Sequence, residues 1–152
     1  MSSTAETTAT PTAIPTTIPT ATHRLDVDGA IGIVTVAYPP VNALSRSMRQ
    51  AIIGGIAAAQ AHPAVQAIVF ICDGRTFLAG ADITEFVKPP QAPSLYEAQD
   101  LIESSANPVI AAIHGASLGG GLEVALCCNY RVVVPSAKCG LPEVHLSAAS
   151  AC

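Results

Sequence analysis

The sequence has few charged residues, and the balance among them is slightly acidic. Only 12% of the 152 residues are Asp, Glu, Lys or Arg, and the formal net charge is −4. A protein that binds nucleic acid through its phosphates normally carries a basic patch, which this composition does not provide. We therefore expect no nucleic-acid partner.

Long apolar runs and internal repeats are also missing. No apolar stretch approaches the roughly 20 residues that cross a bilayer, so we expect no membrane partner. No segment recurs with a fixed period, which argues against a repeat array. Half of the residues are hydrophobic, which is enough to build the core of one small soluble unit.

The cysteines do not form a metal or redox motif. None of their spacings matches a zinc finger or a CxxC pair, and two of the five are adjacent: Cys72, Cys127, Cys128, Cys139 and Cys152. We interpret them as buried, reduced thiols of an intracellular protein. His114 and His145 have no partners at metal-ligand spacing, so we predict no metal site.

Residues 1–22 are rich in Thr, Ala and Pro and show neither a helical nor a strand period. We predict a disordered tail here, followed by a folded domain over 23–146. The tail has no basic start and no continuous apolar core, so it is not a secretory signal, and we expect a cytoplasmic protein. A glycosylated stalk is the alternative that a Thr/Pro-rich composition leaves open.

The remaining chain contains both periodic and alternating apolar patterns. Asp28-Gly29 separates two alternating runs and predicts a hairpin turn. Ser45 or Ser47 can cap a helix whose apolar positions recur with helical spacing, and His62-Pro63 ends it. The expected strands cover 23–28, 30–37, 65–72, 109–113 and 130–134, and the expected helices cover 45–61, 93–106 and 122–128.

The stretch 109–143 carries the strongest indication of chemistry. A glycine triplet, Gly119 to Gly121, follows an apolar strand and opens a helical pattern. The first N–H groups of a helix lack intrahelical partners and carry partial positive charge, so they suit an oxygen that becomes negative during a reaction. A tight strand-to-helix turn without a ligand also explains the glycines.

Two carboxylates lie in this stretch, 143 − 123 = 20 residues apart. Glu123 and Glu143 each stand between apolar sequence neighbours. A carboxyl group in an apolar setting has a raised pKa and can exchange protons near neutral pH. The alternatives are a first-turn acid favoured by the helix dipole for Glu123 and an exposed loop carboxylate for Glu143.

Two segments resemble the signature motifs of the crotonase superfamily, the enoyl-CoA hydratase/isomerase family. They are GRTFLAGADITEF at 74–86 and HGASLGGGLEVALCCNYRVVVPSAKCGLPEV at 114–144. Residues 88–95 are similar to the hydratase portion of multifunctional fatty-acid β-oxidation enzymes. The resemblance implies an α/β fold, a crotonase-like spiral of ββα units.

The resemblance also implies an activity, the addition of water to 2-trans-enoyl-CoA, with isomerisation of 3-enoyl-CoA as a possible second reaction. In the family, the backbone N–H groups that match Ala81 and Gly120 bind the thioester oxygen. Glutamates that match Glu123 and Glu143 activate water and protonate the α-carbon. Coenzyme A is part of the substrate, and no metal or further cofactor is needed.

The family pattern further implies coenzyme A contacts and an assembly. The coenzyme A contacts match Ala79, Ala81, Asp82 and Ile83. After Leu146 the chain departs from the family pattern, so we expect a divergent tail over 147–152 and a fold that is incomplete at the C-terminus. A homo-trimer is expected for the full family domain and is doubtful for this chain. The alternative to a hydratase is an inactive remnant that at most binds acyl-CoA or a partner.

Overall fold

The computed structural model describes residues 19–142 of the chain. Strands β1 (Thr22–Asp28) and β2 (Ile31–Ala37) pair antiparallel, and the turn between them contains Gly29 at a φ of 57°. The predicted hairpin is therefore confirmed. Most of the predicted tail lies outside the described residues, but Ala21 donates a hydrogen bond of 2.7 Å to Ser47 Oγ.

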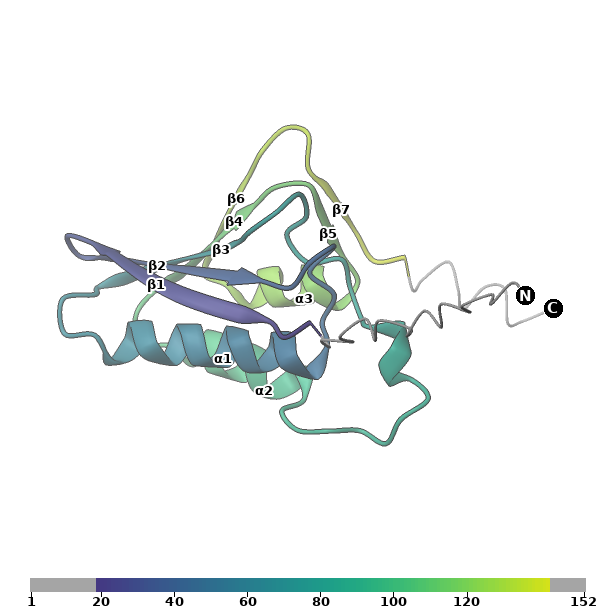
Figure 1. The fold of residues 1–152 in the computed structure, drawn as a ribbon. Coiled ribbons are helices and arrows are strands. Elements are labelled where there is room, and N and C mark those ends of the chain that lie inside the picture. The colour runs from purple at the N-terminus through teal and green to yellow at the C-terminus, as the bar shows by residue number, and fades with distance from the viewer. Residues whose placement is uncertain (1–18, 143–152) are drawn as a thin grey trace, which may run out of the picture.

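A five-stranded sheet forms the centre of the molecule, in the order β1-β2-β3-β4-β6 (Figure 1). Its further strands are β3 (Ala67–Cys72), β4 (Val109–Ile113) and β6 (Tyr130–Val133), and all pairs from β2 onward are parallel. The carboxyl ends of these strands meet at one edge of the sheet. Loops that follow parallel strands gather at this edge, which is the usual place for a ligand in such a sheet.

The first helix, α1 (Arg46–Ala61), connects β2 to β3 and covers one face of the sheet, where it packs against β1, β2 and β3 (Figure 1). Of the two predicted caps, Ser45 is the one that caps it, by accepting a hydrogen bond from the backbone N–H of Met48. Met48, Ile52 and Ile56 are fully buried, because helical spacing brings them to the side that faces the strands.

The other two α-helices differ from their predicted ranges. Helix α2 (Leu95–Glu103) is shorter at both ends, because Ser94 and Glu97 form a capping box that sets its start. Helix α3 (Gly120–Cys127) begins two residues earlier than predicted, so Gly120 and Gly121 lie in its first turn and Gly119 is its N-cap. A 3₁₀ turn, η1 (Ile83–Glu85), lies near the end of the 74–86 motif.

Two short strands were not predicted. They are β5 (Ala116–Leu118) and β7 (Lys138–Gly140), which pair parallel as a separate small sheet. Three residues are too few to show an alternating pattern in the sequence. Their pairing depends on contacts between distant segments, which no local pattern reveals.

The thiols are only partly as predicted. Cys72 and Cys128 are buried and Cys127 is half-buried, but Cys139 is exposed, so the prediction is wrong for that residue. Burial raises the pKa of Cys72 well above its ordinary value. Burial and the neighbouring Cys127 raise the pKa of Cys128 to about 12, against an opposing effect of Arg131. Cys152 lies outside the described residues.

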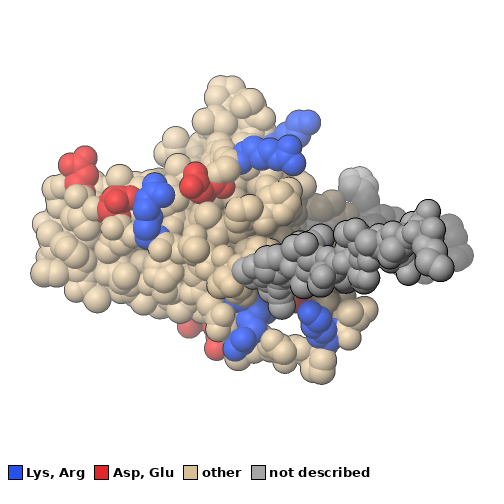
Figure 2. Space-filling model, in the orientation of Figure 1, with Lys and Arg blue, Asp and Glu red and all other residues tan. Residues whose placement is uncertain are grey.

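The surface fits the low charge of the sequence. Figure 2 shows Lys, Arg, Asp and Glu side chains scattered over one face, with wide uncharged areas between them. Within residues 19–142, no helix combines the length and the hydrophobicity needed to cross a membrane.

Candidate functional site

The loops that follow β2 and β3 are joined by one buried side chain, that of Asn42. Its Oδ1 accepts a hydrogen bond of 2.7 Å from the Tyr38 N–H, and its Nδ2 donates to the carbonyls of Asp73 and Thr76, both at 2.8 Å. Asn42 has a φ of 54°, a conformation that asparagine tolerates better than most residues. The two loops are therefore fixed to each other at the carboxyl edge of the sheet.

The loops that follow β3 and β4 lie against each other as well. Leu78 donates to the Ala116 carbonyl, and Leu118 donates to the Leu78 carbonyl at 3.0 Å. A Cβ atom at Gly80 would lie 3.2 Å from the Leu118 carbonyl oxygen, and one at Gly121 would lie 2.4 Å from the Leu78 carbonyl oxygen. Glycine at these positions permits a close approach of two backbones. The two sequence motifs thus come together in space.

Each of these loops presents a backbone donor that was singled out from the sequence. Within the described part of the chain, neither the Ala81 N–H nor the Gly120 N–H donates a hydrogen bond to a protein acceptor. Gly120 is the first residue of α3, so its N–H has no intrahelical partner. Beside Ala81, the Leu44 N–H donates to the Gly80 carbonyl at 2.8 Å and so fixes the loop that carries Ala81. Both donors can bind an oxygen of a ligand.

A pocket of about 450 Å³ lies beside these donors. Ala81 and Asp82 line it, as do residues of the α1 start and of the segment 85–95: Leu44, Arg49, Glu85, Phe86, Lys88, Pro89, Pro90, Gln91, Ser94 and Leu95. A Cβ atom at Gly120 would lie 2.9 Å from Leu95 Cδ2 and 3.1 Å from Leu44 Cδ1. Gly120 therefore adjoins two pocket walls, and a side chain there would press on them.

Glu123 lies near this group but not in the predicted apolar setting. Its Oε2 is 3.8 Å from the position that a Cβ atom at Gly120 would take. Its side chain is exposed, whereas Val124 and Ala125 are buried. The prediction of an apolar environment is wrong because successive helical residues point about 100° apart, so buried neighbours in sequence do not surround Glu123.

The other predicted site residues have varied positions. Glu143 lies outside the described residues, so its position relative to Glu123 is not defined. The Ala79 N–H donates to the Asn42 carbonyl at 3.3 Å, and Ile83 is exposed in η1. His114 directly follows β4, and its Nε2 pairs with the Gly74 carbonyl at 2.8 Å. Residues 19–142 contain no cluster of three His, Cys, Asp or Glu side chains that could hold a metal.

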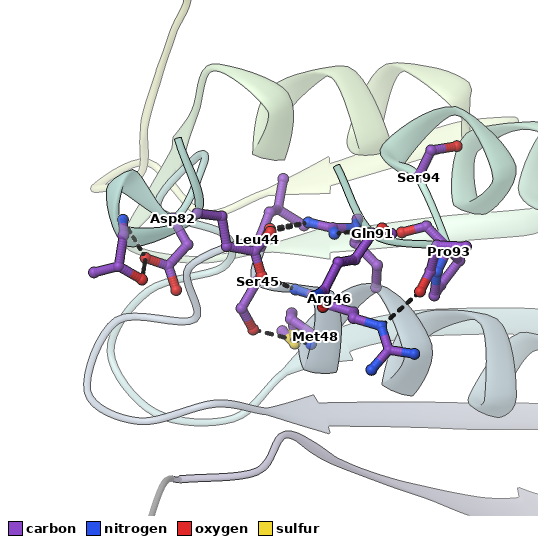
Figure 3. A network of polar contacts seen from close by, with 12 residues as sticks. Leu44, Ser45, Arg46, Met48, Asp82, Gln91, Pro93 and Ser94 are labelled. Carbon is purple, nitrogen blue, oxygen red and sulfur yellow. Dashed lines mark hydrogen bonds and ion pairs between the residues drawn. The ribbon is translucent and has the colours of Figure 1, made fainter. Parts of the chain in front are cut away.

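A polar network around Arg49 was not predicted. Figure 3 shows part of this network, including Leu44, Gln91 and Pro93. The guanidinium of Arg49 donates to the carbonyls of Leu44 at 2.8 Å, Pro93 at 2.7 Å and Gln91 at 3.3 Å. It also forms an ion pair of 2.9 Å with Glu85 Oε2.

The sequence contained one clue to this network. Arg49 follows Met48 and precedes Ile52 on the apolar side of α1, and it is only 9% exposed. Arginine is almost never buried unless it is paired, so an arginine at this position predicts a buried acceptor. The identity of Glu85 could not be read from the sequence, because it lies 36 residues away.

Comparison with known proteins agrees with this geometry. The sequence profile described as "Enoyl-CoA hydratase/isomerase" matches residues 26–151. The chain is 44% identical to a peroxisomal bifunctional enzyme of Danio rerio over 120 residues. The alignment covers 79% of this chain and 17% of that protein. Over 129 residues it is 40% identical to a probable enoyl-CoA hydratase of Bacillus subtilis, covering 80% of this chain and 50% of that protein.

Solved structures show the same likeness. An enoyl-CoA hydratase subunit of Geobacillus kaustophilus superposes with a TM-score of 0.72 at 37% identity, over 83% of this chain and 51% of the other. An enoyl-CoA hydratase/carnitine racemase of Magnetospirillum magneticum gives a TM-score of 0.73 at 32% identity, over 82% and 51%. This chain therefore spans about half of each neighbour, and half or less of the relatives above. By its sequence profile and its crotonase-type α/β fold, the chain belongs to the enoyl-CoA hydratase/isomerase family.

Proposed function

We propose that this chain contributes the oxyanion-binding part of an enoyl-CoA hydratase, which adds water to 2-trans-enoyl-CoA. The observation that carries the proposal is the pair of unengaged N–H groups, those of Ala81 and Gly120, on adjoining loops beside the pocket. The B. subtilis relative is named as a probable enoyl-CoA hydratase, which supports the same reaction.

The chemistry follows from where charge develops. When the oxygen of water attacks C3 of the enoyl group, the thioester oxygen gains negative charge. Two N–H donors directed at that oxygen stabilise it, and removal of one such donor typically costs about 3–4 kcal/mol of activation free energy. The reaction ends when a proton reaches C2. Coenzyme A enters as part of the substrate, and neither step calls for a further cofactor.

Glu123 and Glu143 are the proposed proton carriers. One accepts a proton from the attacking water, and the other delivers a proton to C2. Glu123 lies beside Gly120 and can approach a substrate bound there. On a 3-enoyl substrate, Glu143 alone would take a proton from C2 and return it to C4, which gives the 2-enoyl isomer, so isomerisation is a secondary expectation.

A second candidate function is binding without turnover. It is favoured by the exposure of the Glu123 side chain. In this case the chain binds acyl-CoA, or a partner, through the pocket and the 79–83 segment, where Ala79, Asp82 and Ile83 are the proposed coenzyme A contacts. A homo-trimer is proposed only for a full family domain.

The location of the protein in the cell is also open to test. A cytoplasmic location was expected from the sequence, but several relatives are named as peroxisomal enzymes. Fractionation of the cells that make the protein separates the two locations.

The test is hydration of a short 2-trans-enoyl-CoA. Hydration is monitored as the decrease in ultraviolet absorbance of the conjugated thioester. We expect wild-type turnover and a loss of at least about 100-fold in kcat in each of Glu123→Gln and Glu143→Gln, in line with the usual worth of acid–base groups. Hydration retained in both variants would refute the catalytic assignment. Coenzyme A thioester binding without turnover in the wild type would favour the second candidate.

A further inference from the structure

We infer that Arg49 and Glu85 are positioning residues that fix one wall of the pocket, the segment 85–95, and thereby set the affinity for the ligand. The ligand part of this inference rests on the proposed function. Neither residue is assigned to bond making. Each acts through the backbone that it holds in place.

The first observation is the number of links that converge on one guanidinium. Its three backbone acceptors come from two separate pieces of chain, Leu44 at the start of α1, and Gln91 and Pro93 in the wall. The planar, forked donor set of arginine can satisfy several acceptors at fixed angles, which a lysine ammonium does much less well.

The second observation is that Glu85 uses both of its carboxylate oxygens. Oε2 pairs with Arg49, and Oε1 accepts from the backbone N–H of Arg46 at the first turn of α1. That N–H belongs to the group of helix-start donors that have no intrahelical acceptor. The Arg46 side chain adds a third connection, from Nε to the Ala92 carbonyl at 2.6 Å (Figure 3).

The third observation is that the wall has little else to hold it. Phe86 and Val87 are 74% and 87% exposed, and Pro89, Pro90 and Gln91 are exposed as well. Leu95 packs against the core at the end of the segment, but residues 86–92 are all exposed, and their attachment to α1 is mostly polar. Hydrogen bonds to charged groups that are shielded from water are the stronger kind, so the network is suited to this role.

These contacts also define the cavity. Arg49, Glu85 and Gln91 all line the pocket, as do Leu44 and Leu95, which adjoin Gly120. If the wall separates from α1, the pocket loses one side while the sheet and the two N–H donors stay in place. The expected consequence is weaker binding with little change in the chemical step.

The experiment compares Arg49→Met, Arg49→Lys, Glu85→Gln and the double variant Arg49→Met/Glu85→Gln in the whole chain. Arg24→Met is the matched control, because Arg24 forms an ion pair of 2.9 Å with Asp26 in which both side chains are about 60% exposed. Two quantities are measured: hydrogen exchange of backbone amides without ligand, and KM and kcat for the enoyl thioester.

We expect Arg49→Met to speed amide exchange within 86–95 and to raise KM by about ten-fold or more, with kcat changed by less than about three-fold. Arg49→Lys should give a smaller effect of the same kind. The double variant should be no worse than Arg49→Met by more than about two-fold, because the two residues act as one unit. Arg24→Met should match the wild type in both measurements.

Unchanged exchange at 86–95 in Arg49→Met would overturn the positioning role, and so would a loosened wall with an unchanged KM. Equal loss of kcat would also contradict it, because it would place Arg49 in the chemical step. If Arg49→Met does not fold, Arg49→Lys and Glu85→Gln answer the same questions. If the wild type neither turns over nor binds thioester, the proposed function fails, while the exchange data still decide whether Arg49 fixes the wall.

Discussion

At the scale of single residues, the site depends on positions where a backbone must come close to another. Gly121 is such a position, because its missing side chain leaves room for the Leu78 carbonyl. This contact holds the loop after β3 against the start of α3. The donors Ala81 and Gly120 take their relative positions from contacts of this kind.

Gly121→Ala should therefore destabilise the protein, although alanine favours a helix. The new Cβ atom would lie 2.4 Å from a main-chain oxygen, which cannot move without shifting the loop. We expect a loss of about 1–3 kcal/mol in the free energy of unfolding, as for other overpacked sites. Gly140→Ala is the control, because its Cβ atom would meet only ordinary contact at 3.8 Å. Equal stability of the two variants, measured by urea unfolding, would contradict this account.

The thiols give a second prediction at this scale. Thiolates react, and burial disfavours the thiolate, so Cys72 and Cys128 should resist alkylation at pH 8. Cys139 is exposed and should be modified first. In a Cys152→Ser background, mass spectrometry after brief iodoacetamide treatment should locate the label at Cys139. Rapid labelling of Cys128 in the native protein would show that this residue is not buried.

At the scale of elements, α2 has the most clearly defined start. The Ser94 hydroxyl accepts from the Glu97 N–H at 3.2 Å, and the Glu97 carboxylate accepts from the Ser94 N–H. The hydrogen bond from the Ser94 backbone is the main reason why the pKa of Glu97 is lowered from its ordinary value of 4.5. Because Ser94 also lines the pocket, this cap links helix stability to the shape of the site.

The sign of the pH effect follows from that direction. A carboxyl group with a lowered pKa in the folded state contributes stability above its unfolded value, near 4.5, and loses it as pH falls through the folded pKa. Glu97→Gln should lower Tm at pH 7 and make little difference at pH 3. Ser94→Ala should cost about 1 kcal/mol at either pH, as for other N-caps. A Glu97→Gln effect that persists unchanged at pH 3 would contradict the assignment.

The elements also show how far the sequence could be read. The hairpin and α1 were predictable because a turn dipeptide and a cap residue stand next to clear apolar periods. The strands β5 and β7 were not predictable, because their pairing between Ser117 and Cys139 is long-range. The motif residues Ala81 and Gly120 came from family resemblance, whereas the exposure of Glu123 and the Arg49–Glu85 pair required the packed structure.

At the scale of the whole molecule, one edge of the sheet is unusually apolar and open. Strand β6 is the last strand of the described sheet, and all four of its residues are exposed. Its exposed apolar side chains, and that of the residue after it, are Tyr130, Val132, Val133 and Val134. An open edge with apolar side chains favours association between molecules.

We therefore expect the purified chain to associate as its concentration rises, and Val132→Lys to reduce this. A charged side chain on an edge strand opposes pairing with another edge. Val27→Lys is the control, because Val27 is 40% exposed on β1, at the opposite edge. Light scattering at several concentrations provides the measurement. Equal association of the two variants would show that β6 is not the surface involved.

The Gly120 N–H is proposed to stabilise the substrate oxygen, and one pair of variants at this position separates that role from the effect of added bulk. Proline is tolerated at the first residue of a helix, and Gly120 is the first residue of α3. Gly120→Pro removes the backbone N–H. Gly120→Ala keeps the N–H while adding a Cβ atom beside Leu44 and Leu95, as proline also does. The measurement is kcat/KM for hydration of a 2-trans-enoyl-CoA. We predict that Gly120→Pro is about 100- to 1,000-fold slower than Gly120→Ala. Equal rates for the two variants, or no hydration by the wild-type chain, would contradict the account.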